Sequence, residues 1–477
     1  MSLNAAKQLR RESKFEAALA QAWAAYDEAP DGIAAKELIV KLLQDLPGGL
    51  TASRVSGVVT LLNDPRVEPS HLCAAAWHHL VRAGALLDPA LPAEELARRI
   101  EHSKLALTAL RQDAVQGVAV ERAMTQVRRF LLLEDRWADF PELSAALIAQ
   151  AAMNDGAWPF GDDERSKLSG PFAAAYRPSR KAASARSDVA DATTRAVAEQ
   201  YESWPYPAWR RITWTEPKGI AATLREIDEA ITVGEPADIL VAGCGSGRQA
   251  AMNRVAHPND RIVAIDISAA SLAYASERCA ALGIDGIDYR QLDIHDVKSL
   301  GRRFDVVTCT GVLHHLPDPE AGWAALVDVL KPGGAMHIMV YSKATRLVVR
   351  GIRNRLGELL ARPMDDDLLR EIRRRALDMP PSLRLNTRDF YTLAGVHDLL
   401  AHRHEDPFDL PRIRAGIDRL GLEFCSFGLR GTAQKNAYRN AHPDDPRRRR
   451  FDYWQQIERE NPFLFAGMYD FWCRKPA

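Results

Sequence analysis

One glycine-rich turn constrains the fold of this 477-residue chain more than any other feature. A short apolar run at 238–242 leads into Gly243, Gly245 and Gly247, and a helical pattern begins near Arg248. A strand that turns directly into a helix needs backbone conformations that glycine adopts readily, and it brings bare N–H groups against a ligand. The turn therefore predicts a strand, loop and helix unit with a ligand on the loop.

The same rhythm continues through the C-terminal half of the chain. Short apolar runs alternate with amphipathic helices, which is the pattern of a parallel sheet covered on both faces. We expect a glycine turn at 330–334, before the fifth strand, and an antiparallel partner at the sheet edge from the last run, 465–473. The predicted fold class is α/β, a Rossmann-like sheet of seven strands with an N-terminal all-α domain. The other six strands are expected at 238–242, 261–265, 287–292, 304–309, 335–340 and 422–427.

The N-terminal part of the chain has helical periodicity and no strand alternation. Leu9 to Pro30 is similar to one tetratricopeptide helix pair, although the roughly 34-residue pattern does not clearly repeat. From 156 to 195 the composition changes to Gly, Ser, Asp, Arg and Ala, which predicts a linker. We therefore expect a helical, tetratricopeptide-like domain at 1–155, a linker at 156–195 and a second domain at 196–477. The helices could simply pack, bind a protein or peptide, or dimerise.

Composition and charge exclude several classes of protein. Lys plus Arg equals Asp plus Glu, 63 each, so no general attraction to nucleic acid or to an anionic membrane is expected. No run of about 18 uncharged apolar residues occurs, and the six cysteines never form a C-x-x-C pair. The sequence predicts a cytoplasmic protein without a membrane partner, a zinc knuckle or a disulfide framework, and it leaves the oligomeric state open.

Acidic side chains follow the next two predicted strands. Asp266, before Ile267, ends the second strand, where a carboxylate can accept hydrogen bonds from ribose hydroxyls. Asp293, before Ile294, follows the third strand, where a carboxylate can accept from an adenine amino group. A dinucleotide fingerprint G-x-G-x-x-G would place its third glycine at position 248, which is arginine here. The spacing therefore disfavours a dinucleotide.

With these motifs, residues 196–475 resemble class I S-adenosylmethionine-dependent methyltransferases. The resemblance implies that S-adenosylmethionine lies on the loop 243–247, with Asp266 at its ribose and Asp293 at its adenine. It also implies that the segment Gly311 to Leu316 lines the sulfonium and the methyl acceptor. A NAD-dependent oxidoreductase or a non-catalytic nucleotide-binding module is the alternative.

One position departs from the family pattern. Val241 stands where the family usually has Asp or Glu two positions before the first loop glycine. The ammonium group of the cofactor must therefore find another partner, such as a backbone carbonyl at Ala242, Gly243 or Gly311.

An aromatic segment precedes the first strand. Four aromatic residues and two prolines lie between Tyr201 and Trp209. Aromatic faces attract cations such as a sulfonium, and in the family an N-terminal segment often folds over the cofactor. We therefore predict a lid that includes Tyr201 and Tyr206. The alternative is a segment that packs the linker onto the domain.

The chemistry implied by the resemblance needs few catalytic groups from the protein. Transfer of a methyl group from a sulfonium is an in-line displacement, so orientation and exclusion of water supply much of the acceleration and no metal is needed. A proton must still leave the acceptor, and His314 and His315 are the candidate catalytic bases, with packing as the alternative.

A basic helical insertion is predicted at about 342–411. Within it, Arg388, His402 and Glu405 are expected to shape a polar substrate site, the alternative being surface residues that are solvated or paired. Two candidate ligands at helical spacing are too few for a metal site. A helical recognition domain of this size is hard to justify for a small metabolite, so a protein or peptide acceptor is slightly favoured over a small molecule.

Overall fold

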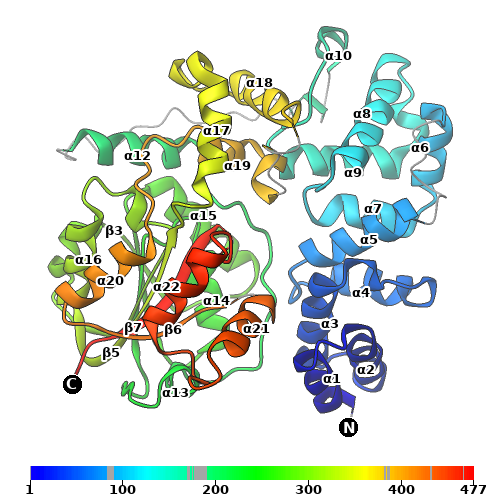
Figure 1. Ribbon diagram of the computed structural model, residues 1–477. Coiled ribbons are helices and arrows are strands. Elements are labelled where there is room, and N and C mark those ends of the chain that lie inside the picture. Colours follow the sequence, from blue (N-terminus) through cyan, green and yellow to red (C-terminus); the bar gives the residue numbers. More distant parts are fainter. Residues whose placement is uncertain are drawn as a thin grey trace. The chain divides into compact units, whose positions relative to one another are not determined.

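The chain forms two compact units, which we call the helical unit and the sheet unit. The helical unit comprises Met1–Arg180, Arg210–Glu216 and Leu356–Leu399, and the sheet unit comprises the three segments between and after them (Figure 1). The computed structural model describes residues 2–82, 91–168, 172–173, 176, 191–380, 383, 387–429, 432–465 and 467–477.

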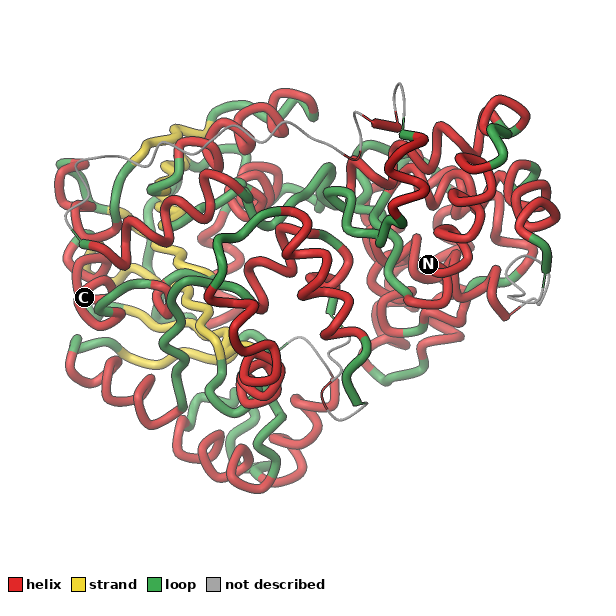
Figure 2. Tube along the Cα trace, turned by 90° about the horizontal axis from the view of Figure 1, so that it is seen from above, coloured by secondary structure: helices red, strands yellow, loops and turns green. Residues whose placement is uncertain are grey.

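The described residues of the helical unit form helices and no strands, as expected for its all-α class (Figure 2). None of the described helices of the chain combines the length and the apolar character that a membrane span requires. The α-helices are α1 (Ser2–Arg11), α2 (Phe15–Glu28), α3 (Ile33–Asp45), α4 (Val55–Asn63), α5 (Ser70–Arg82), α6 (Ala93–Glu101), α7 (Lys104–Gln112), α8 (Val118–Leu133), α9 (Pro141–Met153), α10 (Asp162–Lys167), α18 (Asp366–Leu377) and α19 (Leu393–Leu400). The 3-10 helices are η1 (Pro47–Gly49), η2 (Ala52–Arg54), η3 (Trp137–Asp139), η6 (Gly357–Ala361) and η8 (Arg388–Tyr391).

Small and large apolar side chains alternate in the core of this unit. Ala18 and Ala22 of α2 are fully buried and let neighbouring helices approach, while Trp23 fills the space beside them. Burial of this kind contributes about 25 cal/mol for each Å² of apolar surface removed from water. Helix pairs such as α1 with α2 and α2 with α3 are in contact, whereas a tetratricopeptide repeat stays a prediction.

The predicted linker 156–195 begins inside the helical core. Trp158 is fully buried, and the buried carboxylate of Glu164 accepts from Arg128 Nε at 2.9 Å. Residues 169–171, 174–175 and 177–190 of the predicted linker lie outside the described residues. The boundaries proposed from composition stay a prediction.

Part of the predicted insertion belongs to the helical unit. Arg373 of α18 is buried and forms a bidentate ion pair with Glu121 of α8, with Nη1 at 2.7 Å from Oε1. Arg370 Nε also donates to the carbonyl of Gly156 at 2.7 Å, and the Leu393 N–H donates to the carbonyl of Asn154. Helices α18 and α19 therefore complete the core formed by the N-terminal helices.

The sheet unit is built on a seven-stranded sheet in the order β3-β2-β1-β4-β5-β7-β6. Strands β1 to β5 are parallel, and β7 is antiparallel to both β5 and β6. The predicted fold class is confirmed. The strands are β1 (Asp238–Ala242), β2 (Arg261–Asp266), β3 (Ile287–Gln291), β4 (Phe304–Thr310), β5 (Leu330–Tyr341), β6 (Glu423–Phe427) and β7 (Met468–Arg474).

Two details of the strand prediction are wrong. The last strand lies between β5 and β6 and not at the sheet edge, because its backbone pairs with both of them. Tyr469, Phe471 and Cys473 alternate into the core. Strand β5 begins at Leu330, so the glycine turn expected at 330–334 lies inside the strand bounds, beside an irregularity in the pairing with β4.

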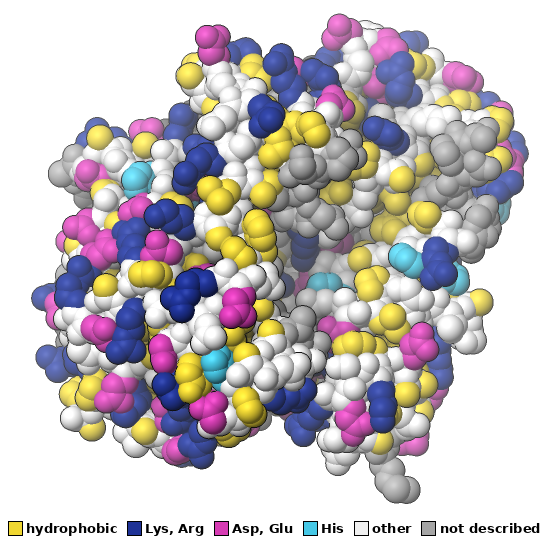
Figure 3. Space-filling model, in the orientation of Figure 1, with side chains coloured by type: hydrophobic (Ala, Val, Ile, Leu, Met, Phe, Trp, Pro, Cys, Tyr) yellow, Lys and Arg dark blue, Asp and Glu magenta, His cyan; other side chains and the backbone are white. Residues whose placement is uncertain are grey.

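Helices cover both faces of the sheet. On one face α16, α20 and α22 pack through residues such as Trp323, Ile413 and Trp454, and on the other α13, α14 and α15 pack through smaller apolar clusters. Lys, Arg, Asp and Glu side chains are interspersed over the visible surface (Figure 3). The helices of this unit are α12 (Ala192–Ser203), α13 (Ile220–Ile227), α14 (Arg248–Ala256), α15 (Ala269–Ala281), α16 (Pro319–Asp328), α17 (Arg346–Leu356), α20 (Leu410–Arg419), α21 (Thr432–Ala441) and α22 (Phe451–Glu460), with η4 (Ile294–Leu300) and η5 (Leu313–His315).

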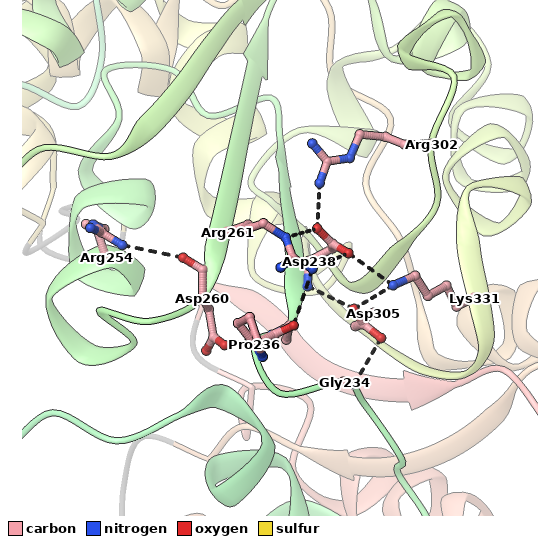
Figure 4. A network of polar contacts seen from close by, with 10 residues as sticks. Gly234, Pro236, Asp238, Arg254, Asp260, Arg261, Arg302, Asp305 and Lys331 are labelled. Carbon is pink, nitrogen blue, oxygen red and sulfur yellow. Dashed lines mark hydrogen bonds and ion pairs between the residues drawn. The ribbon is translucent and has the colours of Figure 1, made fainter.

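A network of charged groups joins the amino ends of the central strands (Figure 4). Asp238 begins β1 and accepts from Arg261 Nε at 2.8 Å, from Arg302 and from Lys331 Nζ at 3.1 Å. The carboxylate of Asp305 accepts from the Asp238 N–H and from Lys331 Nζ, both at 2.8 Å. The Arg261 guanidinium, with Lys331, holds the pKa of Asp238 well below its usual value although burial opposes this. Burial would raise the pKa of Asp305, but Lys331 and backbone N–H groups lower it.

We expect Asp238→Asn to lower the free energy of unfolding by about 1–2 kcal/mol at pH 7, because it removes the charge of a buried carboxylate that pairs with three partly exposed cations. A carboxyl group whose pKa is lower in the folded state adds stability above its unfolded pKa of about 3.9, and this contribution is lost as the pH falls through the folded pKa. The stability difference between the two proteins should therefore shrink below about pH 4. Urea unfolding from pH 3 to pH 7 measures it. As a control, Glu226→Gln alters an exposed ion pair with Lys218 and should change stability by less than about 0.5 kcal/mol.

Candidate functional site

The carboxyl ends of the parallel strands bring the predicted site residues to one edge of the sheet. Val241 of β1 pairs with Thr308 of β4, and Ala242 pairs with Ile265 of β2, so the loops after these strands emerge side by side. The strand order reverses between β1 and β4, and ligands of open α/β sheets bind at such a point. The fold therefore positions a ligand site on the loop that follows β1.

The glycine loop has the backbone that its sequence predicts. Gly243, Gly245 and Gly247 all have positive φ, at 65°, 52° and 80°. A Cβ on Gly243 would lie 2.5 Å from a methyl group of Val312, and one on Gly247 would lie 2.4 Å from Cβ of Ala275. These positions require glycine for conformation and for space, and Gly247 leads directly into α14.

Asp266 organises the glycine loop from the end of β2. Its buried carboxylate accepts from the Gly245 N–H at 2.7 Å and from the Ser268 N–H at 2.9 Å. Burial raises the pKa of Asp266, and the two N–H donors oppose that rise. A carboxylate has about four acceptor positions, so each oxygen can still accept from a ligand hydroxyl. Ser268 caps α15 by accepting from the Ser271 N–H, as the sequence indicates.

Asp293 and its neighbours follow β3 at the same edge. The carboxylate accepts from the backbone N–H and from Nδ1 of His295, both at 2.8 Å, and caps η4. Ile294 is buried and Ile267 is partly buried. These residues lie where the resemblance places adenine and ribose, and their roles as ligands stay predictions.

The turn that follows β4 leaves space beside its backbone, near the glycine loop. Gly311 has a φ of 79°, and a Cβ added there would meet only the Met468 methyl group, at 3.9 Å. Val241 is buried within β1 and brings no charge to the site, and the backbone carbonyl expected to meet the ammonium group stays a prediction. A glycine cradle, two carboxylates and an open turn together fit a nucleoside-containing cofactor.

The aromatic segment before β1 is attached to the loop and to the start of α15. The Trp209 indole donates to the Ser246 carbonyl at 2.8 Å, and Ser246 Oγ donates to the Pro207 carbonyl at 2.6 Å. Glu202 accepts from the backbone N–H groups of Ala269 and Ala270. Sequence reasoning did not single out Glu202.

The two tyrosines predicted as a lid are both partly buried. The Tyr201 hydroxyl lies 3.2 Å from Nε2 of His402, and the Tyr206 carbonyl lies 3.0 Å from where a Cβ on Gly245 would be. Tyr206 is therefore beside the glycine loop and Tyr201 beside His402. Their role as a lid stays a prediction.

Two adjacent histidines lie in η5, directly after β4. His314 is fully buried, and its Nδ1 accepts from the Tyr341 N–H at 3.2 Å. His315 is also buried, and its Nδ1 lies 2.9 Å from the His404 carbonyl. The two imidazole rings have centroids 4.2 Å apart, and the His315 ring stacks on His402 at 3.7 Å. Their catalytic role stays a prediction.

Charged residues that sequence reasoning did not assign to the site stand behind these histidines. Arg346 is buried, pairs with Glu405 and lies over the Tyr341 ring, 4.2 Å from its centroid. Arg353 also contacts Glu405, at 3.4 Å, and donates to the His402 carbonyl at 3.2 Å. The sequence did contain a signal for Arg346. It follows β5 closely, and side chains after the carboxyl ends of the strands lie near the site.

Arg388 was grouped with His402 and Glu405 in the sequence prediction. It belongs to the helical unit, where it contacts Asp113 at 3.3 Å and Glu68 at 3.5 Å. His402 and Glu405 belong to the sheet unit. A shared role for the three residues in a substrate site stays a prediction.

A doubly wound sheet with a glycine loop and carboxylates at its switch point defines a nucleotide-cofactor-binding α/β domain. Residues 239–334 match the family described as a methyltransferase domain. This chain therefore carries a class I S-adenosylmethionine-dependent methyltransferase domain, and S-adenosylmethionine is the cofactor of that class.

Several curated relatives share this part of the chain. An uncharacterized protein of Synechococcus sp. is 34% identical over 262 residues, covering 50% of this chain and 61% of that protein. A ubiquinone biosynthesis O-methyltransferase of Alkalilimnicola ehrlichii is 31% identical over 156 residues, covering 31% of this chain and 62% of that protein. The chain thus spans about three fifths of the length of these relatives.

Among solved structures, PKMT2 from Rickettsia typhi in complex with AdoHcy aligns with a TM-score of 0.41 and 14% identity, covering 57% of this chain and 55% of that one. A magnesium protoporphyrin IX methyltransferase from Synechocystis with bound SAH aligns with a TM-score of 0.30 and 13% identity, covering 54% and 80%.

Proposed function

We propose that this protein transfers a methyl group from S-adenosylmethionine to an oxygen atom of an acceptor held at the carboxyl edge of the sheet. The observation that carries the proposal is the glycine loop of positive φ with the Asp266 carboxylate at the switch point. The relatives named as O-methyltransferases support oxygen as the acceptor atom. The helical unit supports an acceptor larger than a metabolite, as the sequence prediction favoured.

The residues of the chain have separable roles in this proposal. The loop 243–247, Asp266 and Asp293 hold the cofactor, which supplies a methyl group on a positive sulfur that leaves as a neutral thioether. Tyr206 and Gly311 border the reacting end and exclude water. As the acceptor oxygen bonds to the methyl carbon and the carbon–sulfur bond breaks, the acceptor proton becomes strongly acidic. The proton passes to solvent, and His315 Nε2 is proposed to accept a hydrogen bond from the acceptor hydroxyl and so to orient its oxygen.

Thermal shift tests the cofactor directly. Saturating S-adenosylhomocysteine should raise the melting temperature, because a ligand that binds only the folded state stabilises it, while NAD should leave it unchanged. Stabilisation by NAD alone would refute the proposal.

The size of the acceptor is tested by incubating the protein and S-adenosylmethionine labelled in its methyl group with a cell lysate. The labelled products are then separated by molecular size. Label on macromolecules supports a protein or peptide acceptor. Label confined to small molecules would show that the helical unit does not bind a protein or peptide acceptor. Label that resists treatment with base would show that the products are not methyl esters.

We expect Asp266→Asn to weaken binding of S-adenosylhomocysteine about 10-fold to 100-fold, since an amide offers one acceptor oxygen in place of two. Because the pKa of Asp266 is raised, the wild-type affinity should weaken as the pH is lowered through that pKa, and the variant should lack this step. Calorimetric titration between pH 5 and pH 8 measures both effects. An equal affinity in the two proteins at pH 8 would remove Asp266 from the site.

A further inference from the structure

His314 and His315 have opposite hydrogen-bonding states, which their backbone contacts determine. Nδ1 of His314 accepts from the Tyr341 N–H, so the proton of the neutral ring is on Nε2. Nδ1 of His315 faces the His404 carbonyl, which can only accept, so the proton of that ring is on Nδ1 and Nε2 keeps a lone pair. One ring therefore offers a donor and the next offers an acceptor.

The donor of His314 lacks a partner within the described part of the chain. Its Nε2 is buried and has no hydrogen bond, and a buried unsatisfied donor costs about 1–3 kcal/mol. Burial lowers the pKa of His314 well below its usual value, so the ring does not become charged near neutral pH. A ligand oxygen at this nitrogen would offset the cost.

His315 is suited to accept a hydrogen bond and not to carry a charge. Burial lowers the pKa of His315 to about 3, although the bond to His404 acts in the opposite direction. At neutral pH its Nε2 is therefore an acceptor for a hydroxyl. The ring centroids of His314 and His315 lie 4.2 Å apart, so a ligand that bonds to both rings needs two oxygens that lie close together.

Charged side chains lie close to the two histidines. Arg346 and Arg353 both pair with the carboxylate of Glu405. Arg346 and Glu405 are buried, so screening by solvent is weak there. Arg346 also lies over the Tyr341 ring, which packs against both histidines.

We propose that His314 and His315 position the methyl acceptor as a donor and acceptor pair that selects a hydroxyl next to a second oxygen. This proposal rests on the proposed methyl transfer and names its substrate class. Tyr341, which is partly exposed, packs against both rings, with its centroid 3.9 Å from that of His314 and 5.6 Å from that of His315. His315 is the catalytic residue, since it faces the reacting hydroxyl, and His314 holds the neighbouring oxygen.

The test uses salicylate, which has adjacent hydroxyl and carboxylate groups, and its para isomer 4-hydroxybenzoate as the matched probe. Both are titrated into the full-length protein saturated with S-adenosylhomocysteine. We expect salicylate to bind at least tenfold more tightly than the para isomer. Equal binding of the two isomers would overturn the proposal.

Variants separate positioning from folding. His314→Phe should remove the preference for salicylate, while His314→Gln, which keeps an N–H donor near the Nε2 position, should restore most of it. His257→Gln is the control, because His257 lies after α14 near the amino edge of the sheet and contacts the Lys218 carbonyl. If His257→Gln removed the preference equally, the effect would be structural and the proposal would fail.

Nitrogen-15 NMR of histidine-labelled wild-type protein tests the pair without any variant. We expect His314 as the Nε2–H form and His315 as the Nδ1–H form, both neutral from pH 5.5 to pH 8. The opposite assignment would refute the proposal. Absence of S-adenosylhomocysteine binding would instead refute the proposed function, so the two failures are distinguishable.

Discussion

Replacing Gly243 with valine is expected to reduce the affinity for S-adenosylhomocysteine by at least about 100-fold, or ~2.7 kcal/mol. Gly243 has a φ of 65°, which a β-branched residue adopts only with strain. Its new Cβ would also lie 2.5 Å and 2.7 Å from the two methyl groups of Val312. The loop would have to move away from Val312, and the N–H groups that face the cofactor would move with it. Calorimetric titration measures the change.

Gly283 provides the matched control for this substitution. Its φ of 66° is nearly the same, but no atom of the described residues lies within 4 Å of where its Cβ would be, and it is located just after α15. Gly283→Val should therefore lower the melting temperature through backbone strain and leave the affinity within about twofold. A folded Gly243→Val protein that binds S-adenosylhomocysteine within a few-fold of wild type would show that the ligand site is elsewhere.

Replacing Arg373 with alanine is expected to destabilise the helical unit by about 3–5 kcal/mol. Arg373 is buried, and its guanidinium contacts both oxygens of Glu121, the Phe390 carbonyl and the Ala157 carbonyl. The substitution leaves the Glu121 carboxylate buried without its partner, which costs more than the pair itself contributes. Because Glu121 belongs to α8 and Arg373 to α18, hydrogen exchange should increase in both helices.

Arg374 is the control for this effect. It is the next residue of the same helix, but about half of its side chain is exposed and it pairs with Glu371, so Arg374→Ala should change stability by less than about 0.5 kcal/mol. The double variant Arg373→Met with Glu121→Leu should recover most of the loss, because it removes both buried charges together. Unchanged unfolding of Arg373→Ala would show that α18 does not complete the helical core.

Local chemistry made much of the sheet unit predictable from sequence. The glycine loop, the acids after β2 and β3 and the apolar strands each depend on residues close together in the chain, and they appear within a few residues of the predicted places. The place of β7 was not predictable in this way. An alternating apolar strand suits an edge or an interior position, and only its pairing with both β5 and β6 decides between them.

The acceptor side of the site shows the limit of reading a sequence. His314 and His315 were candidates because of their position after β4, but their protonation states depend on Tyr341 and on His404, which is 89 residues beyond His315. Arg388 looked like a partner of His402 and Glu405 because it is near them in sequence. Its ion pairs are with Glu68 and Asp113, which lie far from it along the chain.

The sequence by itself determined the class of the sheet, the conformation of the glycine loop and the helical character of the N-terminal residues, because periodicity and glycine conformation are local properties. Only the tertiary structure decided which insertion helices join the helical unit and which nitrogen of each histidine contacts the backbone. Arg373 and Glu121 are 252 residues apart, and no local pattern relates them. Burial makes such a pair necessary, since a charge removed from water needs its partner wherever the chain provides it.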